Sequence, residues 1–285
     1  NKTPKGANDH EIIFLTQNSI KSKYLKSLDK SLFSNKLFLE QNFLKKDYNN
    51  KSYIFVNCNK FKLSLDYEKI GSKLFEFLKN NKIENSHIKV VNNSLTNVQL
   101  ERVLHGAQLK SYNFSIYKTD KKKQNLNLKL SVVANSLNKT NILRNKLNAL
   151  LEGVFLTRDL VSEPGNILHP DEYAKRITQL RKLGLKVKVF DQKKLKKLGF
   201  NALLGVGQGS VRGSYMVTIE WKGNKNKSKP LAFVGKGVCF DTGGISLKPA
   251  KFIEDMTYDM AGSATVVGLM KTLALRKSKI NAVGV

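Results

Sequence analysis

The sequence predicts an α/β protein, built as an N-terminal α/β domain followed by the first part of a doubly wound α/β domain. Three observations support this fold class. Short runs rich in branched and aromatic residues alternate with longer helical patterns along most of the chain. The 285 residues are enough for two domains, or for one and part of another, with a sizeable core in each. The hydrophobic share of 41% and the charged share of 25% are ordinary for a globular protein.

The N-terminal domain is expected over residues 1–139. Its strands are predicted where β-branched and aromatic residues cluster, and its helices where apolar residues recur every three or four positions. The predicted strands are residues 11–15, 53–57, 88–91 and about 126–133, and the predicted helices are residues 66–78 and 96–109.

A linking helix is expected over residues 140–163, because leucines and a valine repeat on one face and Pro164 with Gly165 then stops the helix. The second domain occupies residues 164–285. Its predicted elements are a helix at 171–183 closed by Gly184, a strand at 185–190, a helix from 191 to about 199, strands at 215–221 and 231–234, a helix after Asp259 and a strand at 280–285.

The helix after Asp259 carries an apolar stripe at offsets of 0, 3, 4, 7 and 8 residues, formed by Val266, Leu269, Met270, Leu273 and Ala274. A helix that packs on a sheet needs a stripe of this kind. Together with the strands on either side, it predicts a βαβ unit.

Three glycines, Gly205, Gly207 and Gly209, have a spacing that also occurs in dinucleotide-binding loops. Such a loop must lead into a helix, whereas residues 215–221 are predicted as a strand. We therefore expect a glycine-rich turn here and no cofactor-binding loop.

The chain is strongly basic, with 50 Lys and Arg against 22 Asp and Glu, a formal net charge of +28 and a pI near 10.0. Such a charge attracts nucleic acid and other polyanions. Only seven of the basic residues are arginine, and the lysines are spread along the chain among many asparagines, which a genome rich in A and T also produces. Nucleic acid therefore stays an open partner on this basis.

The two cysteines, Cys58 and Cys239, are far apart and have no partner motif, which argues against a disulfide framework or a structural zinc site. The four histidines show no spacing of the HExxH type. No apolar run is long enough to cross a bilayer, and the N-terminus, which begins at Asn1, lacks a signal-peptide pattern. We expect a cytoplasmic protein with no membrane contact.

The chemistry is concentrated in residues 231–260. A short apolar strand there opens into a loop that carries Lys236, Asp241 and Lys248, with Asp259 further on. Charged groups at the C-terminal end of a strand occupy the usual place of ligand sites in open α/β sheets. The same residues also fit a purely structural interpretation, in which Asp241 belongs to a turn, the lysines are solvated charges and Asp259 caps a helix.

The amino-acid sequence of this stretch favours the interpretation as a ligand site. The segments VGKGVCFDTGGISLKP and DMAGSAT closely resemble the signature of the leucyl aminopeptidase family, also called cytosol aminopeptidases. Three other segments resemble this family as well: HGAQLKSYNFSIYKTDKKK, TRDLVSEPGNILHPDEYA and GFNALLGVGQGSVRGSYMVTIEWKG. The resemblance covers about residues 105–285. It implies that the second domain is a catalytic peptidase domain, whereas the first is non-catalytic.

Members of this family are two-metal exopeptidases, and the resemblance gives a role to five residues. Lys236, Asp241 and Asp259 match metal ligands, and Asp241 matches the carboxylate that bridges the two ions. A lysine is an unusual ligand, because an ammonium with a reference pKa of about 10.4 must lose its proton beside a dication. Lys248 matches a lysine that stays charged and stabilises the carbonyl oxygen. Met256 matches a methionine that lines the pocket for the first substrate side chain.

The resemblance further implies an aminopeptidase that removes leucine-like N-terminal residues from peptides, with two Mn²⁺ or Zn²⁺ ions and, in the intact protein, a bound bicarbonate. It also implies a homo-hexamer. The family has a second signature, Asn-Thr-Asp-Ala-Glu-Gly-Arg, which supplies two more metal ligands and an arginine, and the 285 residues do not contain it. We therefore expect a truncated catalytic domain that is inactive by itself. Two alternatives stay open: a basic DNA-binding regulator with the same fold, and a catalytically dead homologue.

Overall fold

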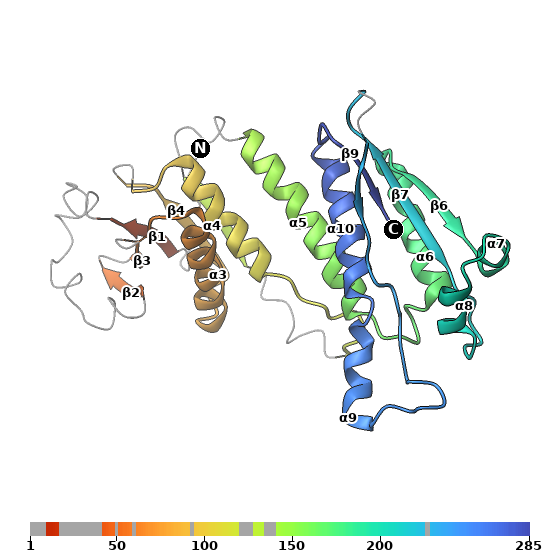
Figure 1. Cartoon of the computed structure of the whole chain (residues 1–285). Coiled ribbons are helices and arrows are strands. Elements are labelled where there is room, and N and C mark those ends of the chain that lie inside the picture. Colours follow the sequence, from red (N-terminus) through yellow and green to blue (C-terminus); the bar gives the residue numbers. More distant parts are fainter. Residues whose placement is uncertain are drawn as a thin grey trace. The chain divides into compact units, whose positions relative to one another are not determined.

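The computed structural model describes residues 10–16, 42–48, 51–58, 61–91, 94–119, 128–133, 141–225 and 229–285. The chain divides into two compact units, Asn1–Arg144 and Asn145–Val285. Each contains its own β-sheet with helices beside it (Figure 1). The predicted α/β fold class is therefore confirmed. Within the described ranges, no helix combines the length and the apolar character needed to span a membrane.

Five strands form the sheet of the first unit: β1 (His10–Leu15), β2 (Phe43–Tyr48), β3 (Lys51–Asn57), β4 (Asn85–Lys89) and β5 (Lys129–Val133). Their order in space is β2-β3-β1-β4-β5. All neighbouring pairs are parallel except β2 and β3. Two helices accompany the sheet, α3 (Ser64–Asn80) and α4 (Asn97–Lys110).

The central strand β1 supplies apolar side chains to both faces of this sheet. Ile12 and Phe14 join a core with the buried side chains of α3 and α4, whereas Ile13 and Leu15 belong to a second cluster. All four side chains are at most 1% exposed. A strand that is buried on both faces has a continuous run of apolar residues. Such a run in the sequence predicts β1.

Two details of the first unit differ from the sequence prediction. The pattern does not predict β2, because its sequence FLKKDY is half charged and its side chains are half-buried or exposed. The strand β4 begins at Asn85 rather than Ile88, since Ser86 and His87 are polar but buried in register with β1. Residues 126–127 of the last predicted strand lie outside the described residues.

Four strands form the sheet of the second unit: β6 (Lys186–Phe190), β7 (Met216–Lys222), β8 (Leu231–Phe233) and β9 (Asn281–Gly284). Their order is β6-β7-β9-β8, with β8 parallel to β9 and β7 antiparallel to both neighbours. The helices are α5 (Asn141–Ser162), α6 (Pro170–Thr178), η4 (Gln179–Leu183), α7 (Gln192–Lys197), α8 (Asn201–Gly207), α9 (Ala250–Ile253), η5 (Glu254–Tyr258) and α10 (Ala261–Leu275). The predicted βαβ unit is confirmed as β8, α10 and β9.

The helix α10 packs on this sheet through the predicted apolar stripe. Met270 is fully buried, and Val266 and Leu273 are each 8% exposed. They share one core with Ile219 of β7 and Ala282 of β9. The stripe therefore fixes the rotation of α10 about its axis, and with it the position of the helix start.

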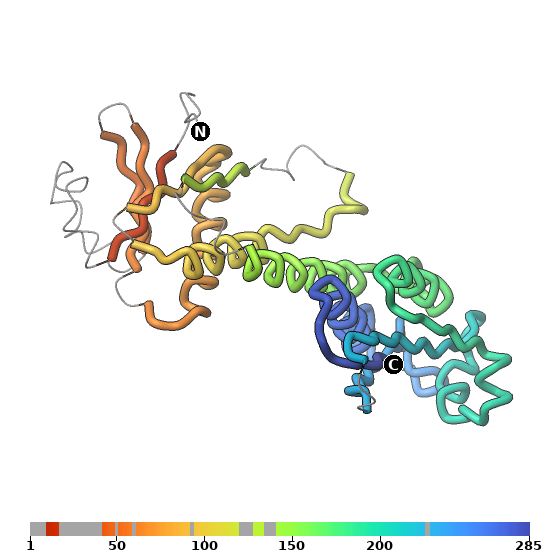
Figure 2. The backbone as a smooth tube through the Cα atoms, turned by 90° about the horizontal axis from the view of Figure 1, so that it is seen from above, coloured from red at the N-terminus to blue at the C-terminus, as the bar shows by residue number. Residues whose placement is uncertain are grey.

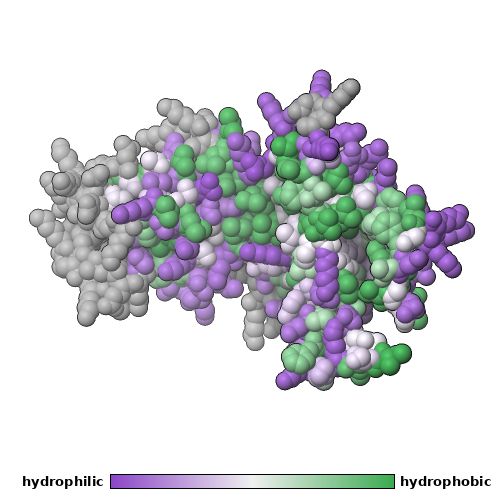
Figure 3. Space-filling view, in the orientation of Figure 1, coloured by the Kyte–Doolittle hydropathy of each residue, from purple (hydrophilic) through white to green (hydrophobic). Residues whose placement is uncertain are grey.

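The two edges of this sheet differ in character. At one edge, β6 exposes Lys186 and Lys188 while Val187 between them is buried. At the other edge, β8 exposes Leu231, which is 55% accessible. Hydrophilic residues also gather around α7, which follows β6 in the chain (Figure 3).

The expected glycine-rich turn is wrong for Gly205 and Gly207, which lie in the helix α8. A Cβ at Gly205 would meet nothing within 4 Å, so no close backbone approach requires a glycine there. The neighbouring Ala202, Leu203 and Leu204 are good helix formers, and they outweigh a glycine cost of about 1 kcal/mol per residue. The predicted stops at Gly184 and Gly199 are confirmed, since both have positive φ angles.

The helices α5 and α10 lie side by side (Figures 1 and 2) and touch at a pair of glycines. A Cβ on Gly268 would lie 2.1 Å from Thr157 Oγ1 and 2.5 Å from the carbonyl oxygen of Gly153. The hydroxyl of Thr157 also donates a hydrogen bond to the carbonyl oxygen of Ala264, at 3.1 Å. The backbones can approach this closely only because the two facing residues lack side chains.

We expect Gly268→Ala to destabilise the second unit by about 1–3 kcal/mol, because the added methyl group must push the two helices apart. Gly205→Ala is the matched control, since it is also a helical glycine but has open space around it. It should be neutral or slightly stabilising. Urea denaturation followed by circular dichroism measures both variants. Equal stability of the two variants would show that the contact between α5 and α10 tolerates a side chain at position 268.

Candidate metal centre

The loop that follows β8 lies against the first turn of α10. Gly235 permits this approach, because a Cβ there would lie 2.5 Å from Ser263 Cα. Two backbone hydrogen bonds hold the loop: the Gly235 amide donates to the Val285 carbonyl, and the Ser263 amide donates to the Lys236 carbonyl, both at 2.9 Å. Lys236 is thereby fixed between the end of β8 and the start of α10.

The side chain of Lys236 forms an ion pair with Asp259, with 2.6 Å between Nζ and Oδ1. The lysine side chain is 62% exposed, whereas that of the aspartate is 16% exposed. The second carboxylate oxygen, Oδ2, is buried and has no hydrogen-bond partner among the described residues. Asp259 is the C-cap residue of η5, as the structural interpretation expects of a helix cap, whereas the N-cap residue of α10 is Met260. A buried carboxylate oxygen without a partner, beside an amine, is a donor set that a cation would satisfy.

Asp241 and Lys248 form a second ion pair, with 2.6 Å between Oδ2 and Nζ. The chain turns sharply between them, and Gly243 and Gly244 have φ angles of 96° and 72°, which favour glycine. The other oxygen, Oδ1, accepts a hydrogen bond from the Gly243 amide at 2.8 Å. The hydrogen bond from Lys248, followed by that from Gly243, lowers the pKa of Asp241. Asp241 therefore stabilises a turn and is also the ionised partner of a lysine.

Met256 lies at this second pair, with its Sδ 3.4 Å from Lys248 Nζ. The five predicted residues thus fall into two contacts, Lys236 with Asp259 and Asp241 with Lys248 and Met256. The charge of Lys236 also contributes to the lowered pKa of Asp241, which places the two contacts within electrostatic reach. In the part of the chain that the structure describes, no three His, Cys, Asp or Glu residues group together. A metal ion in this region would therefore need Lys236 as a ligand beside the aspartates.

A cavity of about 560 Å³ opens beside this loop. It is bounded by parts of α6, α8, β7 and residues 234–240, and by the start of α10. Its wall includes Lys236 but none of the other four predicted site residues. Most of the lining side chains are apolar. The cavity therefore lies next to the charged cluster and has an apolar wall of its own.

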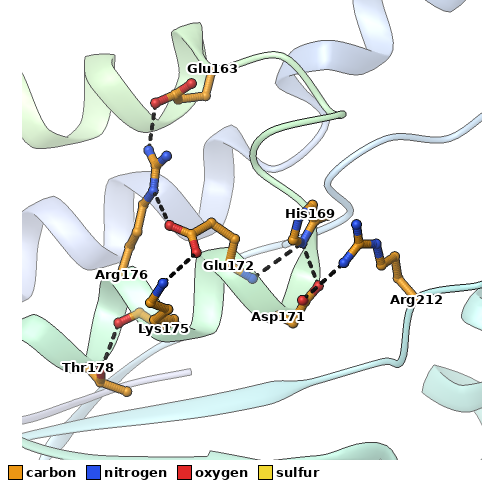
Figure 4. A network of polar contacts seen from close by, with 8 residues as sticks. All are labelled: Glu163, His169, Asp171, Glu172, Lys175, Arg176, Thr178 and Arg212. Carbon is orange, nitrogen blue, oxygen red and sulfur yellow. Dashed lines mark hydrogen bonds and ion pairs between the residues drawn. The ribbon is translucent and has the colours of Figure 1, made fainter.

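A network of ion pairs fixes the start of α6 next to the cavity (Figure 4). Arg176 donates to Glu163 at 2.6 Å, and the side chain of this glutamate is only 4% exposed. Asp171 lies 2.5 Å from Nδ1 of His169, the N-cap residue of α6, and accepts a hydrogen bond from Arg212 at 3.2 Å. These contacts join α6 to the end of α5 and to the loop after α8.

Sequence reasoning misses two hydroxyl residues beside the candidate ligands, Tyr173 on α6 and Ser263 on α10. Their hydroxyl oxygens are 2.9 Å apart. Tyr173 is 5% exposed, and this burial raises the pKa of its hydroxyl well above the usual range. Both residues lie in segments that resemble the family, but they are 90 positions apart, and no pattern along the chain signals their contact.

Both cysteines are free and buried. Burial raises the pKa of the Cys239 thiol and of the Cys58 thiol to about 12, so both are protonated at neutral pH. Metal ions bind the thiolate rather than the thiol. The protonated thiol of Cys239 is hydrogen-bonded to the carbonyl oxygen of Gly237, with 3.8 Å between Sγ and the oxygen.

Comparison with known proteins gives a family for the second unit. The catalytic domain of the cytosol aminopeptidase family matches residues 155–285. A protein of Phytoplasma australiense, named "Probable cytosol aminopeptidase", is 50% identical over 66% of this chain and 38% of its own length. A protein of Brucella melitensis with the same name is 45% identical over 77% of this chain and 46% of its own length.

Solved structures show the same fold. The cytosol aminopeptidase of Coxiella burnetii superimposes with a TM-score of 0.74 and 21% identity, covering 99% of this chain and 58% of that one. The bottromycin maturation enzyme BotP in complex with Mn gives a TM-score of 0.74 and 20% identity, over 97% of this chain and 58% of that one.

The domain match places the second unit with the catalytic domains of a peptidase family, and its α/β fold agrees with this match. That family is the cytosol aminopeptidase family, to whose catalytic domain residues 155–285 belong. It spans less than half the length of the two curated relatives named above.

Proposed function

We propose that the intact protein is a metal-dependent aminopeptidase, which removes leucine-like N-terminal residues from peptides with two Mn²⁺ or Zn²⁺ ions. The observation that carries this proposal is the contact of Lys236 with Asp259, in which one buried carboxylate oxygen has no partner among the described residues. Family membership supports it further. One structural relative, BotP, is described as a complex with Mn.

Each of the five predicted residues has a distinct role in this proposal. Lys236, Asp241 and Asp259 would hold a divalent cation, which would polarise the peptide carbonyl and make bound water more acidic. The ammonium of Lys248 is paired with Asp241 and can stabilise negative charge on the carbonyl oxygen. Met256 contacts this ammonium, and its flexible thioether suits a pocket for apolar side chains.

We infer the remaining features of the intact protein from its resemblance to the family. Residues 164–285 are the first part of the peptidase domain, residues 140–163 are a linking helix, and residues 1–139 are a non-catalytic domain. The intact protein acts on peptides in the cytoplasm, assembles as a homo-hexamer and binds bicarbonate at its active site. The cytosol aminopeptidase name of the relatives supports the location.

Calorimetric titration of the 285-residue chain with Mn²⁺ tests the metal site. We expect Asp259→Asn to weaken binding at least about tenfold, because the amide keeps the shape of the carboxylate and loses its charge.

Glu254→Gln is the matched control for this titration, since Glu254 is an exposed carboxylate in the helical turn just before Asp259. It should bind Mn²⁺ as tightly as the wild type does. If Asp259→Asn bound Mn²⁺ equally well, the ion would lie elsewhere and the candidate centre would lose its support.

Hydrolysis of leucine amide tests the need for the second signature. We expect the 285-residue chain with added Mn²⁺ or Zn²⁺ to hydrolyse this substrate no faster than the buffer does, since its sequence lacks two of the expected ligands. An intact member of the family, assayed under the same conditions, is the positive control. Turnover of the chain comparable with that control would show that the second signature is dispensable.

A second function, nucleic-acid binding, is favoured by one observation. Of the 24 basic and 11 acidic residues in the second unit, ten basic and one acidic lie within residues 175–197. Four of these basic residues lie exposed on α7: Lys193, Lys194, Lys196 and Lys197. A concentrated basic surface of this kind can follow a phosphate backbone.

We expect replacement of these four lysines by glutamine to weaken duplex DNA binding at low salt by about tenfold or more, because fewer counterions are released. Electrophoretic mobility shifts measure the change. The control carries glutamine at four exposed lysines elsewhere in the unit, namely Lys222, Lys251, Lys277 and Lys279. If both sets of substitutions weakened DNA binding equally, the binding would be a general attraction between DNA and a basic chain.

A further inference from the structure

The first turn of α10 holds the two sides of the candidate metal centre together. We propose that the hydroxyls of Tyr173 and Ser263 form a clamp that positions Lys236 against Asp259. This inference rests on the proposed metal centre. Tyr173 and Ser263 are positioning residues, because they act through the backbone next to the candidate ligands rather than on a substrate.

Ser263 forms hydrogen bonds with the backbone on both sides of the ion pair between Lys236 and Asp259. Its amide donates to the carbonyl oxygen of Lys236 at 2.9 Å. Its hydroxyl donates to the carbonyl oxygen of Met260, the residue that follows Asp259, also at 2.9 Å. One residue therefore joins the loop that carries the lysine to the turn that carries the aspartate, and the 2.6 Å between Nζ and Oδ1 depends on both attachments.

Tyr173 fixes Ser263 from the neighbouring helix α6, with 2.9 Å between the two hydroxyl oxygens. A serine hydroxyl has one hydrogen, and a carbonyl oxygen can only accept. Ser263 therefore donates to Met260 and accepts from Tyr173. The clamp is a directed chain of hydrogen bonds that starts on α6 and ends at the residue beside Asp259.

Two of the three residues in the clamp are buried, whereas Ser263 is half-buried and lines the cavity together with Tyr173. Tyr173 is 5% exposed and Met260 is fully buried. Removing the Ser263 hydroxyl leaves the Tyr173 hydroxyl without this partner, which is costly, whereas the Met260 carbonyl keeps a hydrogen bond from the Ala264 amide at 3.0 Å. The loop also has little room for another position, because a Cβ on Gly235 would already lie 2.5 Å from Ser263 Cα.

The clamp matters because the two candidate ligands come from separate segments and one of them is long and flexible. The side chain of Lys236 is 62% exposed, so only its backbone is held by packing. Groups that orient metal ligands from behind typically change metal affinity 10 to about 100-fold when they are removed. We expect the same order of effect here.

Hydrogen exchange followed by mass spectrometry, on the chain without metal, tests the clamp directly. Tyr173→Phe and Ser263→Ala should each speed amide exchange in residues 234–240 and at the start of α10 by about tenfold or more, because the loop opens more often. Titration of the same variants with Mn²⁺ should show an affinity lowered about 10 to 100-fold.

Two hydroxyl deletions away from the clamp are matched controls. Tyr67→Phe removes a hydroxyl that accepts a hydrogen bond from Gln99 in the first unit. Thr265→Ala removes a hydroxyl on α10 itself, which donates to Ala261. Neither should change exchange in residues 234–240 or the affinity for Mn²⁺. Ser263→Thr keeps the hydroxyl and should restore both measurements towards the wild type.

The outcomes separate the clamp from the metal centre. Unchanged exchange in Tyr173→Phe and Ser263→Ala overturns the clamp, whatever the metal affinity does. Faster exchange with unchanged Mn²⁺ affinity overturns the positioning role. If the wild-type chain does not bind Mn²⁺, the proposed metal centre fails, and the exchange measurement alone decides whether the hydroxyls hold the loop.

Discussion

The contact between the loop after β8 and the first turn of α10 is the constraint on which the rest of the second unit depends. Gly235 lets the two backbones meet, and the Ser263 amide then bonds to the Lys236 carbonyl. Because β8 and β9 are parallel and α10 crosses between them, the end of β8 and the start of α10 lie at the same end of the sheet. The charged side chains meet there, at the place where open α/β sheets usually bind ligands.

The elements with a strong pattern of their own are those that the sequence predicts well. β1 is an unbroken apolar run, and α10 carries a full stripe from Val266 to Ala274, so each can be recognised without its neighbours. β2 is different, because its half-charged sequence forms a strand only through pairing with β3. In α8 two preferences compete, and the leucines prevail over the glycines.

The candidate site is likewise predicted only in part by the sequence. Its signature identifies Lys236, Asp241, Lys248 and Asp259, but not which lysine pairs with which aspartate. Along the chain Lys236 is nearer to Asp241, yet it pairs with Asp259, since the turn at residues 243–244 directs Asp241 back to Lys248. The contact of Tyr173 with Ser263 depends on how α6 packs beside α10, which residue spacing does not encode.

The unequal edges of the second sheet affect how separate molecules associate. The lysines of β6 repel the strand of an approaching molecule, because natural sheets commonly use exposed charge to prevent pairing between edges. At β8 the exposed Leu231 and Ala232 offer no such repulsion. Aggregation of the purified 285-residue chain through intermolecular strand pairing would therefore begin at β8, and a single lysine introduced there would improve its solubility.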